Sequence, residues 1–451
     1  MRIWIYTLVI ALYLLSTFTN LQVINYLTGA IAIVAICVSI KYATGLYFYF
    51  GLFFLATGVI LFLLTDNSLL DFLLYFDSML GMLALFLVLP FLNSIIRIGQ
   101  YDTNLNLLLQ RGADRLDILY WRSFSVTHML GLFLNIATIP LLRSSLDRTL
   151  KSLSTEMSNK FLTQSLLRGY ALCLMWSPLE VMVITSLDMT GIHYYQVFLP
   201  LVSLVILIIG VNWTLSYFKF RQIKLQIGDH AHLPPLSKVS RKLIEMISML
   251  LILVSITSAL QHFLDKGFLL AVVLTIIPLS FVWAFFIKKL KRYITFTIPH
   301  WKERTNGLGN FFFMFLSAGL FVDMLSDSGV LSFLQVWFSA LSDRTLLLYF
   351  MIGFYFLVTS LIGFHPLVSI TLLAQLLSPI LSEGASISLA IVLITCSLST
   401  VMYSPFNMSV SILANLLRIN PLKIVKWNLP FAIFHMTISI FFALLINKLF
   451  T

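Results

Sequence analysis

The feature that most constrains this chain is the recurrence of apolar runs from one end to the other. Of its 451 residues, 59% are hydrophobic and 10% are charged, and the mean hydropathy is +0.97. Soluble domains carry roughly 25% charged residues, whereas a helix that crosses a bilayer needs about 20 consecutive apolar residues. The sequence therefore predicts an all-α polytopic membrane protein.

The apolar runs divide the chain into separate helices. We expect eleven full-length transmembrane helices, at 3–18, 21–40, 46–65, 72–98, 165–188, 193–217, 243–262, 267–287, 309–327, 387–416 and 427–449. Two further apolar stretches, 118–143 and 343–380, do not fit as single crossings.

The charges in the loops orient these helices. Lys and Arg gather in the loops 219–242, 288–304 and 418–426, which we therefore place on the cytoplasmic side. The loops 66–71 and 188–193 lack both residues and should face outward. This orientation puts the N-terminus in the cytoplasm, and we expect a bacterial plasma membrane. The net charge of +11 reflects these loops, and nucleic acid is not expected as a partner because no soluble domain is large enough to bind it.

The three cysteines, Cys37, Cys173 and Cys396, all fall within apolar segments. Neither a CxxC motif nor a Cys/His cluster accompanies them, so we expect no disulfide framework, no metal site and no other cofactor. The N-terminal apolar run is expected to be a retained helix, because no small-residue cleavage site follows it.

Loop orientation also decides how the two odd stretches lie. Segment 72–98 runs inward and segment 165–188 runs outward, so 118–143 must start and end inside. By the same argument 343–380 starts and ends outside. Each is then predicted to be a re-entrant hairpin, which a membrane tolerates only where the tip is buried in protein or lines a wet cavity.

Two Ser-Pro stretches indicate an internal repeat. M-W-S-P at 175–178 aligns with M-Y-S-P at 402–405 at an offset of 227 residues, and the hairpins align at an offset of 232. Because the charges give the two halves opposite orientations, we predict an inverted-topology repeat, the common architecture of secondary transporters. The predicted parts are an extra N-terminal helix (1–19), repeat 1 (20–217, with broken helix 165–188), a cytoplasmic linker (218–242) and repeat 2 (243–451, with broken helix 387–416).

The Ser-Pro stretches are the first candidates for a binding site. A proline inside a helix removes one backbone donor and clashes with the carbonyl one turn earlier. The freed carbonyls and half-helix ends then form a polar surface at membrane depth. Beside Pro178 and Pro405, the side chains of Ser177, Ser404 and Asn407 add possible ligands. A proline kink satisfied by neighbouring helices is the alternative, but two breaks at matching repeat positions favour a site.

Three ionisable residues lie near these features. Glu180 follows Pro178 inside an apolar helix, where a carboxylate usually faces a cavity; it is a candidate proton carrier or cation ligand. A structural pairing with Arg168 or with a polar residue of the other hairpin is the alternative. His128 and His365 lie near the hairpins and could bind an anion or relay protons. The alternative for both is a neutral histidine that is hydrogen-bonded within its hairpin.

The hairpin tips supply weaker candidates. We place the tips at V-T-H, residues 126–128, and V-T-S, residues 358–360. Thr127, Thr359 and Ser360 are therefore included among the binding candidates, although Ser and Thr also pack helices together in membranes.

One segment resembles a known family. Residues 311–331, FFFMFLSAGLFVDMLSDSGVL, resemble a recurring phrase of the ion transporter superfamily, which includes the arsenite efflux permeases, the melanosomal P protein and the divalent-anion:sodium symporters. Residues 363–380 are similar to the second hairpin of that group, and the Ser-Pro segments to its broken helices. The symporters' Ser-Asn-Thr tip motif is absent and their Gly-rich sodium loops are sparse, so the resemblance implies neither a solute nor a coupling ion.

Together these features predict a secondary active transporter of a small polar or anionic solute, coupled to H⁺ or Na⁺. Its site would lie between the two hairpins and the two broken helices, moving against a scaffold of 21–98 and 243–327. A lipid or lipid-linked glycan translocase on the same fold is the alternative, and a non-transporting sensor or assembly factor is a third.

Expectations about partners and chemistry follow from the same features. The expected partners are the lipid bilayer and a small-molecule solute, and a homodimer is a further candidate. We do not expect an enzyme, because the sequence has no GxSxG, P-loop or HExxH motif.

Overall fold

The computed structural model describes residues 2–19, 21–65, 68, 70–110, 113–225, 236–382 and 386–450. In that part of the chain the secondary structure is helical, apart from one antiparallel bridge between Arg115 and Lys224. The middle of the predicted linker 218–242 lies outside the described residues, as does part of the outward loop 66–71. Lipid selects such a fold, because each helix satisfies its own backbone hydrogen bonds.

Twelve segments among the described residues are long and apolar enough to cross a membrane. They are Arg2–Thr19, Gln22–Ser39, Gly45–Leu63, Asp71–Ile98, Leu116–Asp147, Tyr194–Phe220, Val239–Leu264, Phe268–Phe286, Gly309–Asp327, Thr345–Ile362, Ile387–Leu417 and Pro421–Leu449. The prediction of an all-α polytopic membrane protein is confirmed. The exact number of crossings and the re-entrant placement of the hairpins stay predictions.

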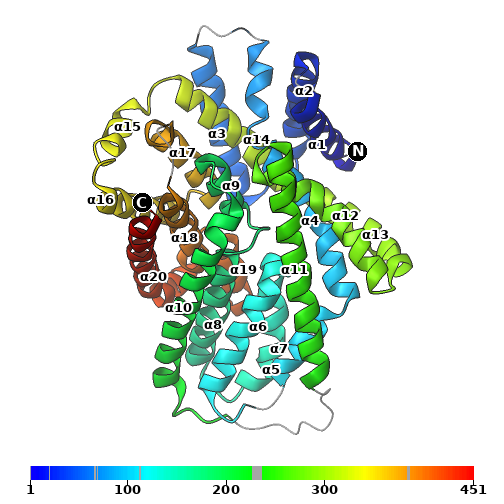
Figure 1. Cartoon of the computed structure of the whole chain (residues 1–451), viewed down its shortest axis with the longest axis vertical. Helices are drawn as coiled ribbons and strands as arrows, with labels where there is room; N and C mark the ends of the chain where they lie inside the picture. The colour runs from blue at the N-terminus through cyan, green and yellow to red at the C-terminus, as the bar shows by residue number, and fades with distance from the viewer. Residues whose placement is uncertain are drawn as a thin grey trace. The chain divides into compact units, whose positions relative to one another are not determined.

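The helices form two structural units, each assembled from several stretches of the chain (Figure 1). Unit 1 consists of Met1–Ile95, Leu269–Ala340 and Thr371–Pro379, and unit 2 of Ile96–Phe268, Leu341–Ile370 and Ile380–Thr451. Unit 1 holds α1 (Arg2–Thr19), α2 (Gln22–Ser39), α3 (Gly45–Leu63), η1 (Asp71–Phe76), most of α4 (Leu80–Ile98), most of α12 (Phe268–Phe286), α13 (Leu290–Asn306), α14 (Gly309–Asp327) and α15 (Ser332–Ser339). Unit 2 holds α5 (Tyr101–Gln110), α6 (Leu116–Leu134), η2 (Asn135–Ala137), α7 (Thr138–Leu150), α8 (Thr155–Leu174), α9 (Val181–Thr190), α10 (Tyr194–Phe220), α11 (Leu236–Leu264), α16 (Thr345–Ile362), α18 (Ile387–Tyr403), α19 (Met408–Leu417) and α20 (Pro421–Phe450). Helix α17 (Pro366–Ser382) is divided between the units.

Close packing in unit 1 depends on glycines of α3. Gly51 and Gly58 lie two turns apart and face Phe313 and Leu320 of α14. A Cβ atom at Gly51 would lie 2.6 Å from the Phe313 ring, and one at Gly58 would lie 2.9 Å from Leu320 Cγ. The equal spacing on both helices keeps each contact on one face. Small residues thus let the two backbones approach, as is common between membrane helices.

Helix pairs occupy both stretches that we predicted as hairpins. Helices α6 and α7 are joined by η2, and α16 and α17 by a short turn. The predicted tip positions are wrong. Residues 126–128 lie inside α6, about two helical turns before its end, and residues 358–360 lie inside α16, a few residues before its end. The chain reverses instead at Asn135, where φ is 51°, and at Gly363, where φ is 122°. These positive φ angles end a right-handed helix.

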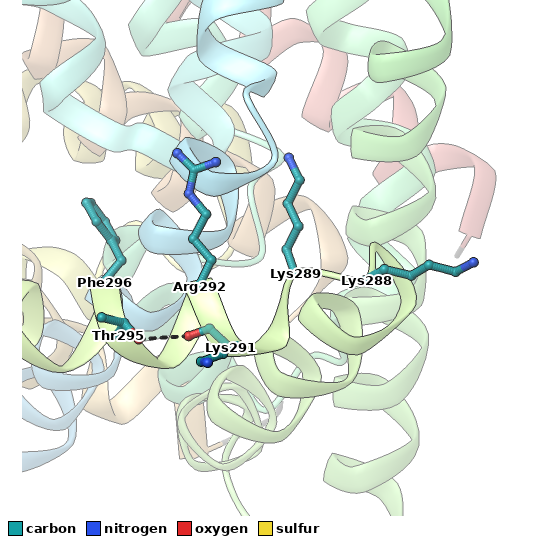
Figure 2. A pocket seen from close by; sticks show the side chains of 6 residues that line it. All are labelled: Lys288, Lys289, Lys291, Arg292, Thr295 and Phe296. Carbon is teal, nitrogen blue, oxygen red and sulfur yellow. Dashed lines mark hydrogen bonds between the residues drawn. The ribbon is translucent and has the colours of Figure 1, made fainter.

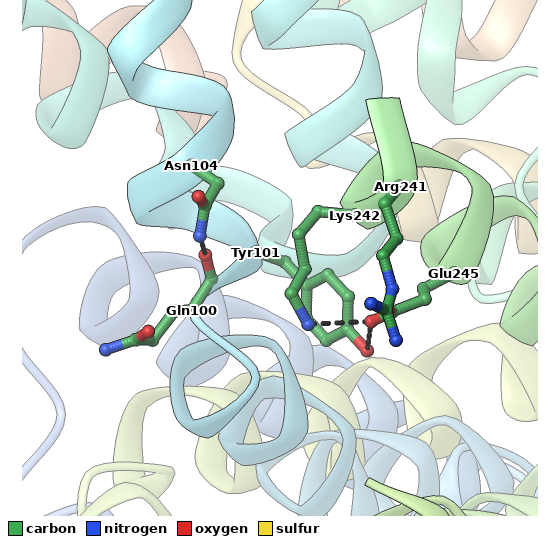
Figure 3. Close-up of polar contacts among 6 residues, drawn as sticks. All are labelled: Gln100, Tyr101, Asn104, Arg241, Lys242 and Glu245. Carbon is green, nitrogen blue, oxygen red and sulfur yellow. Dashed lines mark hydrogen bonds and ion pairs between the residues drawn. The ribbon is translucent and has the colours of Figure 1, made fainter. Parts of the chain in front are cut away.

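Helix α11 lies in unit 2, although we expected 243–262 to belong to the scaffold. Glu245 of α11 accepts hydrogen bonds from the Tyr101 hydroxyl at 3.0 Å and from Lys242 Nζ at 2.7 Å (Figure 3). The Lys242 ammonium also lies 4.6 Å from the centre of the Tyr101 ring. These side chains hold α11 against α5, a contact that hydropathy alone does not predict.

Candidate functional site

All the candidate residues lie in unit 2. They come from α6, from α16 and the turn after it, and from the two breaks that separate α8 from α9 and α18 from α19. The residues are Thr127, His128, Ser177, Pro178, Glu180, Thr359, Ser360, His365, Ser404, Pro405 and Asn407.

Pro178 interrupts the first broken helix, between α8 and α9. In a continuous helix the Leu174 carbonyl would accept a hydrogen bond from residue 178, but proline has no N–H. Helix α8 ends at Leu174, whose carbonyl accepts instead from the Ser177 N–H at 3.1 Å. The Glu180 N–H then donates to the Ser177 carbonyl at 3.2 Å, and α9 begins at the next residue.

Pro405 interrupts the second broken helix, and a serine replaces the missing donor. The Val401 carbonyl loses its helical partner because residue 405 has no N–H. Ser409 Oγ donates to that carbonyl at 2.5 Å. Asn407 Oδ1 accepts from the Ser409 N–H at 3.1 Å and caps α19. Side chains within the break therefore satisfy its backbone hydrogen-bonding groups. The side-chain oxygen of Asn407 is already used as an acceptor.

The two breaks share one local geometry. The Glu180 N–H bonds to the Ser177 carbonyl at 3.2 Å, and the Asn407 N–H bonds to the Ser404 carbonyl at 3.1 Å. These pairs are related by the same offset that aligns the two Ser-Pro sequences. The local match therefore extends from the residue types to the backbone hydrogen bonds.

In each predicted repeat, the aromatic residue before Ser-Pro forms a hydrogen bond with a helix of the preceding helix pair. Trp176 Nε1 donates to His128 Nε2 at 3.0 Å, and Ser360 Oγ donates to the Tyr403 hydroxyl at 3.0 Å. His128 and Ser360 are equivalent at the hairpin offset, as Trp176 and Tyr403 are at the break offset. Because Nε2 of His128 accepts a bond, that nitrogen carries no proton. His128 is thus a buried histidine with a structural partner.

The hydroxyl groups of the candidate site also have partners. Thr127 and Thr359 each donate to the carbonyl one turn earlier in their own helices, at 2.6 and 2.9 Å. Ser404 Oγ donates to the Ser360 carbonyl at 2.8 Å and so joins α16 to the second break. These contacts assign the hydroxyls to packing and positioning in this conformation.

Ser177 and His365 accept bonds from nearby backbone groups. Ser177 Oγ accepts from the Leu179 N–H at 3.3 Å, and His365 Nδ1 accepts from the Leu367 N–H at 3.3 Å. His365 thereby helps to start α17, where the first backbone N–H groups lack helical partners.

Glu180 differs from the other candidates. Neither Glu180 nor its predicted alternative partner Arg168 takes part in an ion pair among the described residues. Its half-buried carboxylate lies at the N-terminus of α9, near the Met182 amide. The positive end of a helix dipole favours negative charge there. Glu180 can therefore take up a proton or a cation without first breaking an ion pair.

Arg168 lies at the centre of a buried polar cluster that our sequence reasoning missed. Its guanidinium donates to Asn428 Oδ1 at 3.2 Å, to Asn212 Oδ1 at 3.1 Å and to the Trp427 carbonyl at 3.4 Å. The guanidinium carbon also lies 4.2 Å from the centre of the Phe431 ring. An arginine inside an apolar helix is the signal that could have found this cluster.

The broken helices of the two predicted repeats pack in one bundle. Helix α18 packs against α8 and α9, and α19 packs against α7 and α8. Helix α6 runs beside α8 (Figure 1). Candidate residues from both halves of the sequence are thereby brought into the same part of unit 2.

A separate concavity lies on unit 1, where α12 ends and α13 begins. It has a volume of about 700 Å³, and four of its six lining residues are cationic (Figure 2). The lining residues are Lys288, Lys289, Lys291, Arg292, Thr295 and Phe296. None of the candidate residues is among the residues that line this concavity.

Comparison with known proteins concerns the fold. No protein-family model and no curated protein matches the sequence. The YdaH transporter of Alcanivorax borkumensis is 13% identical with a TM-score of 0.56, over 89% of this chain and 98% of that one. MtrF of Neisseria gonorrhoeae, from a class of antimetabolite efflux pumps, is 12% identical with a TM-score of 0.51, over 90% and 94%. The chain has the fold of these membrane transporters. Neither neighbour supports the narrower resemblance to the ion transporter superfamily.

Proposed function

We propose that this protein is a secondary active transporter of a small polar or anionic solute. The observation that carries the proposal is the pair of helix breaks, which share backbone geometry and pack in one bundle. Discontinuous helices are where many secondary transporters bind their solutes. The likeness in fold to two transporters supports the same function.

The contacts around the breaks suggest which elements move together. The bond from Trp176 to His128 ties α6 to the first break, and the bond from Ser404 to the Ser360 carbonyl ties α16 to the second. We therefore assign Ser360, Ser404 and His128 to holding each helix pair against its break. In the proposed alternating-access cycle, each pair and its break move as one body.

Glu180 is the proposed coupling residue. Its carboxylate has no ion-pair partner among the described residues and lies at a helix break. Binding of H⁺ or Na⁺ would neutralise it and so favour one of the two conformations. The equivalent position in the second repeat holds Asn407, whose oxygen is bonded to Ser409. We therefore assign coupling to the first repeat alone.

Flux through reconstituted protein tests this function. Proteoliposomes should be given an inward H⁺ or Na⁺ gradient and offered organic acids, amino acids and oxyanions in turn. We expect uptake or efflux of at least one solute to depend on one of the gradients. The absence of gradient-dependent flux across all three classes would contradict the proposal.

Glu180→Gln tests the coupling role separately. The amide keeps the shape of the side chain but cannot take up a proton and binds Na⁺ more weakly. We expect gradient-driven flux to be lost while exchange of solute for solute persists. Glu303→Gln, at an exposed position of α13, is the matched control and should retain both activities. Full gradient-driven flux in Glu180→Gln would remove Glu180 from the mechanism.

A further inference from the structure

Arg168 is a buried cation whose bonding partners are all neutral. It is 9% exposed, and its guanidinium bonds to two asparagine oxygens, one backbone carbonyl and the Tyr120 hydroxyl. No ion pair among the described residues includes it. Amide dipoles can solvate a buried charge but cannot neutralise it. The cluster therefore retains a net positive charge.

A polar stripe leads from the beginning of α8 to this cation. Lys160, Gln164 and Arg168 recur every four residues and so share one face of α8. Lys219, near the end of α10, donates to Gln164 Oε1 at 2.6 Å. Along this path Lys219 is exposed, whereas Gln164 and Arg168 are buried. The stripe thus connects the surface of unit 2 with the buried guanidinium.

The stripe carries charges of one sign. Lys219 lies close enough to Lys160 and to Arg168 to be repelled electrostatically by both. None of the three forms an ion pair with an acidic residue in the described part of the chain. Like charges held together without a counter-ion attract an anion from solution.

Asn212 supplies an independent observation at the inner end of the stripe. It is fully buried, and its Oδ1 accepts from Arg168 at 3.1 Å and from the Tyr120 hydroxyl at 3.2 Å. Among the described residues, its Nδ2 has no hydrogen-bond partner. A buried amide donor left unpaired is destabilising, and the group it lacks is an acceptor.

We propose that Arg168 and Asn212 Nδ2 bind the negatively charged group of a small carboxylate or phosphate. A guanidinium offers five N–H donors in a planar arrangement that suits both groups. Three of its bonds go to Asn428, Asn212 and Trp427, and the Tyr120 hydroxyl is a fourth partner, which leaves one N–H for an incoming oxyanion. The anion enters along the Lys219 and Gln164 side of the stripe. The inference that this anion is the transported solute rests on the function proposed above. The inference that the anion binds here does not.

Thermal unfolding of the purified full-length protein tests the binding. Intrinsic fluorescence would report the midpoint in sodium acetate, succinate or phosphate, each compared with sodium chloride at equal ionic strength and pH. We expect at least one oxyanion to raise the midpoint in a concentration-dependent way. Response to the carboxylates alone or to phosphate alone identifies the class. No rise with any of the three salts would overturn the proposal.

Two variants locate the site. Arg168→Gln should lose the oxyanion response, whereas Arg304→Gln, an exposed change with the same loss of charge, should keep it. Asn212→Asp places a carboxylate against the guanidinium and can still accept from Tyr120. It should raise the midpoint without added anion and abolish the response, because the internal carboxylate occupies the site. Asn420→Asp at an exposed helix cap is its control.

The outcomes separate this inference from the proposed function. An oxyanion response that survives in Arg168→Gln and Asn212→Asp overturns the site. If the site binds oxyanions but no gradient drives their flux, the inference holds and the transport proposal fails. If gradient-driven flux is found without any oxyanion response, the transport proposal holds and this inference fails.

Discussion

The indole of Trp176 donates a hydrogen bond to the imidazole of His128, with 3.0 Å between Nε1 and Nε2. The two rings also stack, with their centres 5.9 Å apart. This contact joins α6 to the residue immediately before the first Ser-Pro. In the second repeat Ser360 and Tyr403 form the equivalent contact. The broken helices are therefore supported at matching places by chemically different pairs.

Trp176→Phe should destabilise the protein. The substitution keeps an aromatic ring but removes the N–H, so the buried Nε2 of His128 loses its donor. An unsatisfied buried acceptor costs about 1–3 kcal/mol, and we expect a loss in that range in the free energy of unfolding, measured by denaturant titration in detergent.

Tyr403→Phe is the matched comparison for that prediction. Its loss should be smaller, because Ser360 Oγ also donates to the Leu357 carbonyl at 3.0 Å and keeps that partner. Equal losses in the two variants would mean that the Trp176–His128 bond contributes no more than its counterpart.

Ser409→Ala should weaken the second break. The Val401 carbonyl would lose its donor, at a cost of about 1–3 kcal/mol. Adding Pro405→Ala supplies an N–H at the position that normally serves this carbonyl, so the double variant should recover part of the lost stability. Ser411→Ala, which removes a longer bond of 3.3 Å to the Pro405 carbonyl, is the control. No recovery in the double variant would disprove this account of the break.

Gly29→Ala should be strongly destabilising in unit 1. A Cβ atom there would lie 1.8 Å from the Leu73 carbonyl oxygen, so the backbone of α2 or η1 must shift. Gly210→Ala in α10 meets nothing within 4 Å and should gain up to about 1 kcal/mol from helix propensity. Unfolding midpoints of the two variants should move in opposite directions. A neutral Gly29→Ala would refute the close approach.

The basic concavity of unit 1 should make stability depend on lipid charge. Each Lys or Arg near an anionic surface contributes about 1 kcal/mol. In nanodiscs, phosphatidylglycerol should raise the unfolding midpoint relative to phosphatidylcholine, and Arg292→Gln should reduce that difference. Lys302→Gln, exposed on the same helix and outside the concavity, should leave the difference nearly unchanged. An equal effect of both variants would show that net charge alone matters.

Much of the helical plan could be predicted from hydropathy, because lipid permits few other backbone structures. Pro178 and Pro405 located both breaks for an equally simple reason, the missing N–H. The predicted turn positions were wrong. The chain reverses at Asn135 and Gly363 through positive φ angles, and the sequence contains several other asparagines and glycines that could also have formed the turns.

The partners of the site residues could not be predicted, because they come from distant parts of the chain. Ser409 replaces the donor lost at Pro405, and Arg168 bonds to residues of α10 and α20. Sequence spacing does not show which of the many polar groups in the chain will lie near a given site residue after folding. Only the structure excluded a pairing of Glu180 with Arg168 among the described residues.

The unequal contacts before the two prolines have a thermodynamic consequence. In the proposed cycle the two predicted repeats exchange shapes, so identical contacts at these positions would contribute equally to the inward-open and outward-open forms. An imidazole–indole bond in one repeat and a hydroxyl–hydroxyl bond in the other remove that equality. In the proposed cycle this difference contributes to a preference of the empty protein for one side before any solute or ion arrives.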